Sequence, residues 1–356
     1  MKKYISGKNY LLRPFLCFLL CTGYSLKSRS IHRPIDPLIP RITTRWVGNK
    51  EKFSFQDSHL EEYALFKLFD KRFLFFHQLP KTQILYRHHI DKCVTSDLLE
   101  KEIQQLIKEV HGGKREFTHF TVLQEKNFNR HLASGLLIVK FKKYPFVVKL
   151  FIETPSSFVK PFDKGWEPRF IFFMSGGVNR HLTGFTRIKN LELINKKIRS
   201  SKKWSKFVDT PRKWFWVPPK SKWIELAGYN IGGKEKQKIR FPGTYCIIAD
   251  AIKPERIFSV FNPKERKIAL ELYNYLDILV DAHINNFMIE KGTKKLVIVD
   301  TEHFPTVVGF RKRPPKCKNY TSWYLQLSSK CGKETFFRTK KERRAAQTVP
   351  NEMQLL

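Results

Sequence analysis

Carboxylate and carboxamide side chains flank a short predicted hairpin in the C-terminal third of the sequence. Asn286 immediately precedes one apolar run, Asp300 immediately follows another, and a polar loop with a single glycine joins the two runs. Short β-branched runs joined by such a loop predict a β-hairpin. If that hairpin is regular and centred on Thr293, Asn286 and Asp300 are cross-strand neighbours with Cα atoms about 5 Å apart.

Asp281 precedes Asn286 on the turn that leads into this hairpin. The turn would bring two carboxylates and one carboxamide to the same strand end. Oxygen ligands of this kind suit a hard cation such as Mg²⁺ together with its phosphates. Asp and Asn also cap and turn chains that have no such site, so a purely structural hairpin mouth is the competing interpretation.

Two stretches around the hairpin resemble the catalytic core of the protein-kinase-like superfamily. They are DAHINNFMI, which begins at Asp281, and VIVDTE, which ends at Glu302. The patterns D-x-H-x-x-N and hydrophobic-D-x-[DE] are closest to the aminoglycoside/choline-kinase branch, and the Asp-to-Asn spacing also suits the kinase catalytic loop. The resemblance is close over residues 279–304 and loose elsewhere.

This resemblance implies ATP and Mg²⁺ as cofactors and gives roles to the motif residues. Asp281 is the expected catalytic base, with His283 and Asn286 in the same catalytic loop. Asn286 and Asp300 are the expected metal ligands, with Glu302 as a further metal contact. The expected partners are a nucleotide and an unidentified phosphate acceptor, either a protein or a small molecule.

An upstream strand supplies a lysine for such a site. Two apolar runs joined by Lys-Lys-Tyr-Pro predict a second hairpin, with Lys149 in its second arm, 146–151. By the resemblance, Lys149 contacts the phosphates and is held by Glu192, on a helix predicted over 186–199, or by Glu153. Alternatively, Lys149 guards an exposed edge strand and Glu192 neutralises basic neighbours on its own helix.

The clearest predicted helix covers residues 262–280 and leads directly into Asp281. Asn262 is a good N-cap, a proline takes the first helical position, and Glu265 stands where a capping box places an acid. The resemblance implies a long buried helix at this place. The sequence departs from protein kinases in having Leu-Val-Asp instead of His-Arg-Asp, and it lacks a glycine-rich loop before Lys149.

Further periodic segments predict the surrounding elements. Helices are expected over 57–77 and over 96–110, the second capped by Ser96 or Asp97. A strand is expected over 244–249. By the kinase-like order of elements, the segment from Ala249 to Ile252 would contact adenine through backbone groups.

The composition is that of a folded, strongly basic protein. A 42% apolar content argues against wholesale disorder, and 356 residues suffice for one large domain or two lobes. The formal net charge of +35 attracts phosphates, nucleic acid or anionic membrane, but it is spread along the whole chain, as on an ordinary solvated surface. The tryptophans and basic residues of 202–222, Lys213 among them, suit single-stranded nucleic acid or a membrane surface, or else form a buried strand.

The N-terminus predicts a targeting segment. Residues 1–26 combine a basic start with a short apolar run, which is typical of a signal peptide or an N-terminal anchor. The expected location is therefore exported or membrane-anchored, with the cytoplasm as the alternative. Export would permit a disulfide between Cys317 and Cys331.

The sequence thus predicts an α+β protein with a two-lobed protein-kinase-like fold, a mostly antiparallel N-lobe sheet and a reduced helical C-lobe. The expected function is an ATP- and Mg²⁺-dependent phosphotransferase. The alternative is a catalytically inactive kinase-like protein (a pseudokinase) or a basic binding module for nucleic acid or anionic membrane. The expected parts after the targeting segment are an extended linker (27–50), a helical extension (51–125), an N-lobe-like sheet with an inserted helix (126–252), a reduced C-lobe (253–337) and a disordered tail (338–356).

Overall fold

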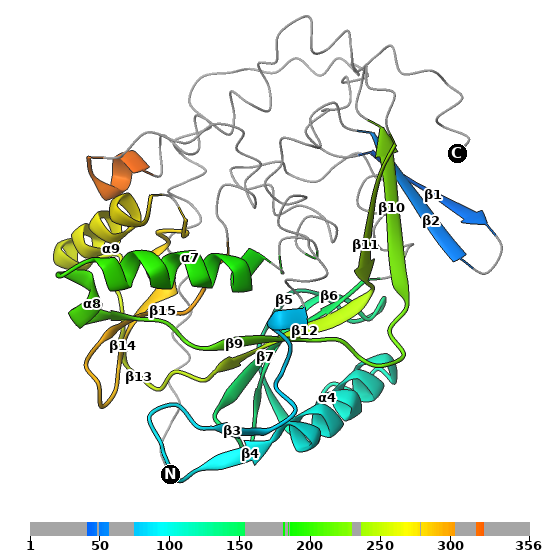
Figure 1. Ribbon diagram of the computed structural model, residues 1–356, viewed down its shortest axis with the longest axis horizontal. Coiled ribbons are helices and arrows are strands. Elements are labelled where there is room, and N and C mark those ends of the chain that lie inside the picture. The colour runs from blue at the N-terminus through cyan, green and yellow to red at the C-terminus, as the bar shows by residue number, and fades with distance from the viewer. Residues whose placement is uncertain are drawn as a thin grey trace, which may run out of the picture. The chain divides into compact units, whose positions relative to one another are not determined.

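The computed structural model describes residues 41–47, 50–56, 75–153, 181, 184, 186–229, 236–277, 279–302 and 318–323, all within one unit of the chain, 36–356. These residues form an α+β fold with mostly antiparallel strand pairs (Figure 1). Several predicted segments lie outside the described residues. They are the targeting segment, the C-terminal tail, both cysteines of the predicted disulfide, and residues 57–74 of the helix predicted over 57–77.

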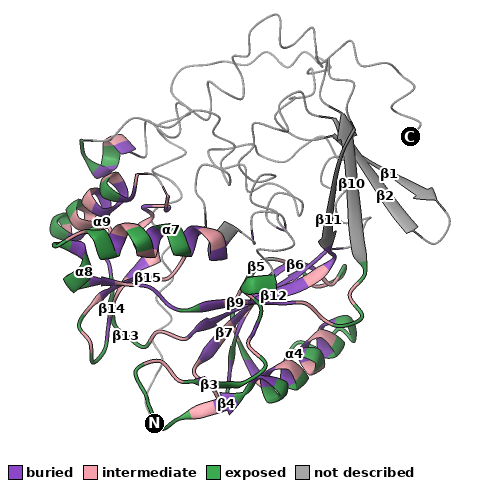
Figure 2. Cartoon of the chain, viewed as in Figure 1, coloured by how far each residue is buried: buried purple, intermediate pink, exposed green. Residues whose placement is uncertain are grey.

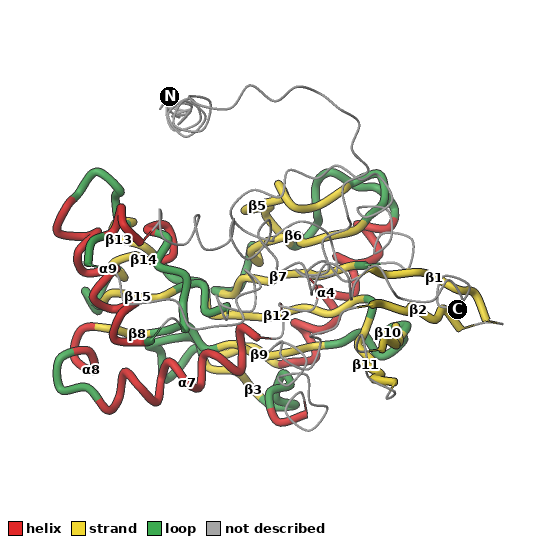
Figure 3. The backbone as a smooth tube through the Cα atoms, turned by 90° about the horizontal axis from the view of Figure 1, so that it is seen from above, coloured by secondary structure: helices red, strands yellow, loops and turns green. Residues whose placement is uncertain are grey.

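A five-stranded antiparallel sheet contains Lys149. Alternating side chains put Phe146, Val148 and Leu150 on one face of this sheet and Lys149 on the other. The second predicted hairpin, which holds Lys149, is confirmed, and it has a neighbour on each side. The strand order is β5 (Phe120–Asn129), β6 (Ser134–Phe141), β7 (Phe146–Ile152), β12 (Thr244–Asp250) and β9 (Lys213–Trp216). Figure 3 shows these strands side by side.

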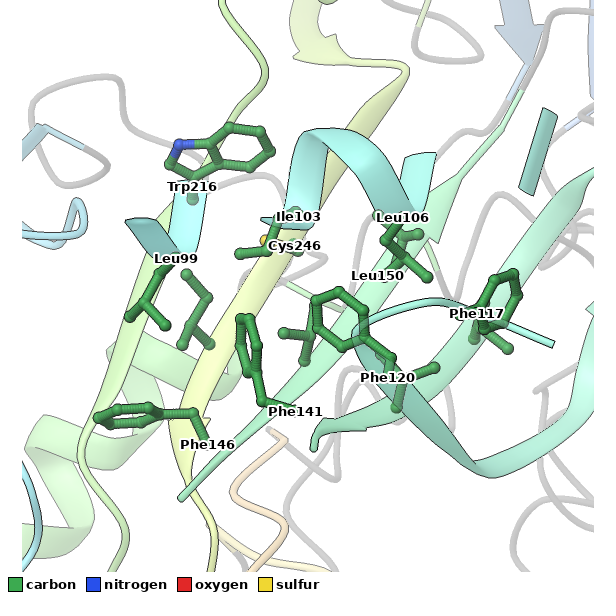
Figure 4. Packing of buried hydrophobic residues seen from close by; sticks show 14 of the residues in the cluster. Leu99, Ile103, Leu106, Phe117, Phe120, Phe141, Phe146, Leu150, Trp216 and Cys246 are labelled. Atoms are coloured by element: carbon green, nitrogen blue, oxygen red, sulfur yellow. The ribbon is translucent and has the colours of Figure 1, made fainter. Parts of the chain in front are cut away.

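Helix α4 (Ser96–His111) covers the face of this sheet opposite to Lys149. Its side chains Leu99, Ile103 and Leu106 have no exposed surface and pack with apolar residues of the sheet, including Phe141 and Leu150 (Figure 4). Burial of large apolar side chains stabilises such a layer by about 1.5–3 kcal/mol for each one. Helix α4 therefore does not cover the face of the sheet that carries Lys149.

A second hydrophobic cluster joins α7 (Thr186–Ser200), α8 (Trp204–Phe207) and α9 (Pro263–Leu276) to the first predicted hairpin. The predicted inward residues of α7, including Ile188 and Ile194, are buried, and Figure 2 shows a buried stripe along this helix. The hairpin consists of β14 (Phe287–Glu290) and β15 (Leu296–Ile298), as predicted. This cluster positions the residues on both sides of the hairpin.

The remaining strands form three groups. Strands β14 and β15 lie between β13 (Pro254–Ile257) and β8 (Val208–Asp209), in the order β13–β14–β15–β8, and the β15–β8 pair is parallel. Strands β3 (Gln83–Leu85) and β4 (Cys93–Thr95) pair with each other. A further sheet has the order β1 (Arg41–Val47), β2 (Lys50–Gln56), β10 (Trp223–Tyr229) and β11 (Lys236–Pro242), so β1 occupies part of the expected extended linker.

The N-cap of α9 is confirmed. The Asn262 side chain accepts hydrogen bonds from the N–H groups of Lys264 and Glu265, which satisfies orphan donors of the first turn. The helix ends earlier than predicted, because Asp277 turns out of it with a φ of 68°. The predicted cap of α4 is wrong: β4 runs straight into that helix, so the extended residue Thr95 takes the cap position.

The hairpin register differs from the prediction by one residue. Asn286 lies opposite Val299, whose N–H donates to the Asn286 carbonyl at 3.0 Å, and not opposite Asp300. The closing pair is Glu290 and Lys295: the Glu290 N–H donates to the Lys295 carbonyl at 2.9 Å, and the Glu290 carbonyl accepts from the N–H of Lys294 at 3.0 Å. The centre of the hairpin therefore lies half a residue earlier than Thr293.

Candidate functional site

Lys149 and Asp300 are in direct contact. The Lys149 Nζ atom lies 3.0 Å from Oδ2 of Asp300, and both side chains keep some exposure, 15% and 21%. The pair joins the central strand β7 to the residues that follow hairpin β14–β15. Two predicted site residues that are far apart in the sequence are thus brought together.

Arg187, in the first turn of α7, binds both acids that follow the hairpin. Its Nε lies 3.1 Å from Oδ1 of Asp300, and a terminal nitrogen binds Glu302. The guanidinium also lies 5.7 Å from the centre of the Phe151 ring. The side chain is only 2% exposed, so α7 positions a buried cation beside Asp300 and Glu302.

A third cation, Lys213 on β9, supports the residue between the two acids. Its Nζ donates to Thr301 Oγ1 at 2.6 Å and to the Val299 carbonyl at 3.2 Å. The Thr301 hydroxyl donates in turn to the Arg187 carbonyl at 2.6 Å. Lys213 and Lys149 lie on the same face of the sheet, because Ala249 pairs with Lys213 and its β12 neighbour Ile247 pairs with Lys149.

The pKa values reflect this concentration of charge. Burial alone would raise the pKa of Asp300, but the positive charges of Arg187, Lys149 and Lys213 hold it far below its ordinary value. Burial lowers the pKa of Lys213 well below its ordinary value, and the charge of Lys149 lowers it further. Burial, more than the neighbouring charges, thus disfavours the charged form of Lys213 in the ligand-free protein.

Asp281 has the opposite perturbation. Burial raises the pKa of its carboxyl group to about 7, and the negative charges of Glu302 and Asp300 contribute, although a hydrogen bond from the backbone N–H of His283 acts to lower it. That N–H lies 2.9 Å from Asp281 Oδ1. A carboxyl group with this pKa can accept a proton near neutral pH, as a general base must.

The other two members of the predicted catalytic loop orient its backbone. Asn286 donates from its side-chain nitrogen to the Asp281 carbonyl at 3.2 Å. The ring of His283 accepts from the backbone N–H of Asn285 at 3.3 Å and caps the short 3₁₀ helix η2 (Ile284–Asn286). His283 therefore positions the loop, and its Nδ1 is engaged as an acceptor.

The predicted pair between Lys149 and Glu192 does not form. Glu192 is exposed, and its carboxylate lies 3.1 Å from the His77 ring. It follows Leu191 on α7 and so faces away from the apolar stripe. Lys149 binds Asp300 instead of Glu192 or the alternative, Glu153, which is buried just after β7.

The predicted adenine-contacting segment already uses two backbone donors. The Asp250 N–H donates to the Arg212 carbonyl at 3.2 Å, and the Ala251 N–H donates to the Pro145 carbonyl at 2.8 Å. Arg212 also binds the Asp250 carboxylate through two nitrogens. Ala249 lies within the sheet, paired with residues of β7 and β9, and a backbone contact of this segment with adenine remains a prediction.

The stretch 202–222 favours the strand interpretation over an exposed aromatic patch. Phe215 and Trp216 are buried in β9, and Trp204 is buried in α8, of which it is the first residue. Lys213, counted as a surface cation in the sequence interpretation, is buried and contacts Thr301. Base stacking would need exposed rings, which these three residues do not offer.

The residues around Asp300 do not fit a divalent cation well. Lys149 and Arg187 each occupy one carboxylate oxygen of Asp300, and Arg187 also holds Glu302. A dication at these oxygens would displace a buried arginine and add charge to an already electropositive site. The expected metal ligands Asp300 and Glu302 are brought together, but around a guanidinium.

A second ion cluster lies elsewhere in the fold. Among the described residues, the only three His, Cys, Asp or Glu side chains with ligand atoms all within 4.8 Å are His88, Asp209 and Glu290. Arg87 already binds both acids, at 2.9 Å and 2.8 Å. This group is therefore explained as an ion cluster that ties β8 and β14 to the β3–β4 loop.

Arg187 and Lys213 were not among the predicted site residues. A signal for Arg187 exists: with Leu191, Ile194 and Ile198 it falls at helical spacing on the apolar face of α7. A basic residue on such a face needs a buried partner. For Lys213 no comparable signal exists, because both faces of β9 are apolar around it.

Comparison with known proteins adds no relative. No protein-family model matches the chain, and no curated protein sequence matches it significantly. None of the helices in the described ranges has the length and apolar character that a membrane span requires.

Proposed function

We propose that the chain is an ATP-dependent phosphotransferase with a two-lobed arrangement of the protein-kinase-like type. The contact between Lys149 and Asp300, 3.0 Å apart, carries this proposal. In protein kinases the phosphate-binding lysine is on the third strand of the sheet and lies in the same phosphate site as the metal-binding aspartate. Lys149 is on the third strand of the five-stranded sheet in chain order, and α7 follows as the inserted helix.

Asp281 is the proposed base. Its raised pKa of about 7 lets it accept the proton of an acceptor hydroxyl near neutral pH. The hydrogen bonds from His283 and Asn286 to Asp281 keep the loop in place. Lys149 and Arg187 would stabilise the phosphates by charge, which is the main catalytic contribution in phosphoryl transfer.

The test is turnover of ATP by the full-length protein. Release of phosphate to water serves as a readout that needs no knowledge of the acceptor. Asp281→Asn should lower turnover about 10²- to 10⁴-fold and leave ATP affinity within about threefold. The control is Lys203→Gln, which removes an exposed lysine paired with Glu271 and should change neither quantity.

A catalytically inactive nucleotide-binding protein is the second candidate. It is favoured by Arg187, which occupies the two acids that would otherwise serve the phosphates through a metal. ATP binding with no turnover above that of Asp281→Asn would support this candidate over the enzyme. A wild-type protein that is folded and binds no ATP contradicts both.

The proposed partners and location rest on the composition and on the N-terminal sequence. The net charge of +35 supports binding of nucleic acid or anionic membrane, with a strong salt dependence. The apolar run within residues 1–26 supports export or membrane anchoring. Neither proposal uses the contacts around Asp300.

A further inference from the structure

Arg187 has an unsatisfied hydrogen-bond donor. Its Nε and one terminal nitrogen bind Asp300 and Glu302, but Nη1 is buried and has no hydrogen-bond partner among the described residues. A buried guanidinium N–H without an acceptor is unfavourable, because the lost hydrogen bonds to water are not replaced. The fork of a guanidinium matches phosphate oxygens, which would supply the missing acceptor.

The surrounding charges also favour an anion. Three cationic side chains, Lys149, Arg187 and Lys213, meet at two carboxylates, Asp300 and Glu302. Lys213 bonds only to neutral oxygen atoms among its recorded partners. An incoming polyphosphate would be attracted by Lys149 and Arg187 and would favour the charged form of Lys213, whereas a dication would disfavour that form.

We propose that Arg187 takes the place of the divalent cation expected from the kinase-like resemblance, so that the site binds the polyphosphate of a nucleotide without a metal. This inference rests on the proposed nucleotide site and specifies how that site recognises its ligand. Lys149 and Lys213 are the accompanying cations. Arg187 is preorganised for this role, because Asp300 and Glu302 fix its position and α7 anchors its backbone.

The backbone around Arg187 supports its fixed position. The Thr301 hydroxyl donates to the Arg187 carbonyl at 2.6 Å. One turn later on α7, the Asn190 side chain donates to the carbonyl of Thr301 at 3.0 Å and to that of Glu302 at 3.3 Å. The helix and the acidic segment are thus tied together on both sides of the guanidinium.

The experiment measures ATP binding to the full-length protein by equilibrium dialysis, once in EDTA and once in excess Mg²⁺. The wild type should bind ATP with dissociation constants that differ by about threefold or less. Inorganic tripolyphosphate should compete with ATP in EDTA, since the cations recognise the phosphates. Arg187→Gln should bind ATP about tenfold more weakly in EDTA. Mg²⁺ should partly restore its binding, because the two acids are then free to hold a metal.

The outcomes separate this inference from the function beneath it. If the wild type binds ATP only in the presence of Mg²⁺, the inference is overturned but the proposed nucleotide site stands. The same holds if Arg187→Gln binds ATP in EDTA as tightly as the wild type does. A failure of tripolyphosphate to compete also overturns it. Absence of ATP binding in both buffers contradicts the proposed function itself. If Arg187→Gln does not fold, as judged by circular dichroism, the wild-type comparison of the two buffers decides alone. Lys203→Gln is the matched control for loss of one positive charge.

Discussion

Two arginines, Arg87 and Arg187, each bridge two carboxylates, but the two clusters differ in how completely the guanidinium is used. Arg87 binds Glu290 through Nε at 2.8 Å, Asp209 through one terminal nitrogen at 2.9 Å and the Thr210 carbonyl through the other at 2.9 Å. Every nitrogen of that guanidinium has a partner. Arg187 leaves one terminal nitrogen without a described partner.

The clusters also differ in charge. Arg87 is the only fixed cation facing its two acids among their recorded partners, with the histidine ring of His88 3.1 Å from Glu290. Arg187 shares its acids with Lys149 and has Lys213 close by. A cluster whose guanidinium donors are all used holds a fold together, whereas a cluster with an unused buried donor is prepared for an anion. The difference separates a structural ion cluster from a candidate site.

Removal of Arg87 should give the largest loss of stability. Arg87→Gln leaves Glu290, which is 5% exposed, and Asp209 without a fixed cation, and loss of one partner from a buried pair costs about 3–5 kcal/mol. Arg187→Gln should cost less, about 1–2 kcal/mol, because Lys149 remains paired with Asp300. Urea unfolding at pH 7 measures both free energies.

The nucleotide affinities should have the opposite order. Arg87→Gln, where folded, should bind ATP like the wild type, since its cluster does not include Lys149 or Asp300. Equal losses of stability in the two variants, or a loss of ATP affinity in Arg87→Gln, would remove the distinction between a structural and a functional cluster.

Asp281→Asn should raise stability above neutral pH. The pKa of Asp281 is about 7 in the folded protein, against 3.8 ordinarily, so the folded state holds the proton more tightly. Its stabilising effect is complete below pH 4 and is lost as the pH rises through 7. The variant should gain roughly 2 kcal/mol at pH 8, about half of what the full shift would give, because Asp281 is partly exposed.

Glu290 supplies the opposite case within the Arg87 cluster. Burial would raise the pKa of Glu290, but the hydrogen bond from Arg87 and its other bonds lower it below 4.5. Glu290→Gln should therefore lose stability at pH 7, and its difference from the wild type should shrink as the pH falls below about 4. Urea unfolding between about pH 2 and pH 8 measures both variants. If both variants shift stability in the same direction at pH 8, Asp281 is a structural acid.

Local patterns in the sequence could predict the elements but only part of the site. Strand β7 with Lys149 and helix α9 with its Asn262 cap depend on periodicity and capping, which act over a few residues. The resemblance put Lys149 and Asp300 in one site, and they are in contact at 3.0 Å, while Glu192 was wrong as the partner of Lys149 because it lies on the exposed side of its helix. The position of Arg187 opposite Asp300 depends on how α7 packs on the second cluster, and no local pattern determines that. The register of the hairpin likewise depended on its turn, which shifted Asn286 from Asp300 to Val299.

The smallest expected effect on stability comes from Lys213. Burial and the charge of Lys149 lower its pKa well below the ordinary value, so its positive charge contributes little to the stability of the ligand-free protein. Lys213→Met keeps the volume and loses the bonds to Thr301 and Val299, for a net change within about 1 kcal/mol. Urea unfolding at pH 7 measures this change. ATP affinity in EDTA should nevertheless fall several-fold, about 3- to 10-fold, because a bound polyphosphate would favour the charged lysine. If Lys213→Met loses stability and keeps the wild-type ATP affinity, Lys213 has a structural role, as Arg87 does.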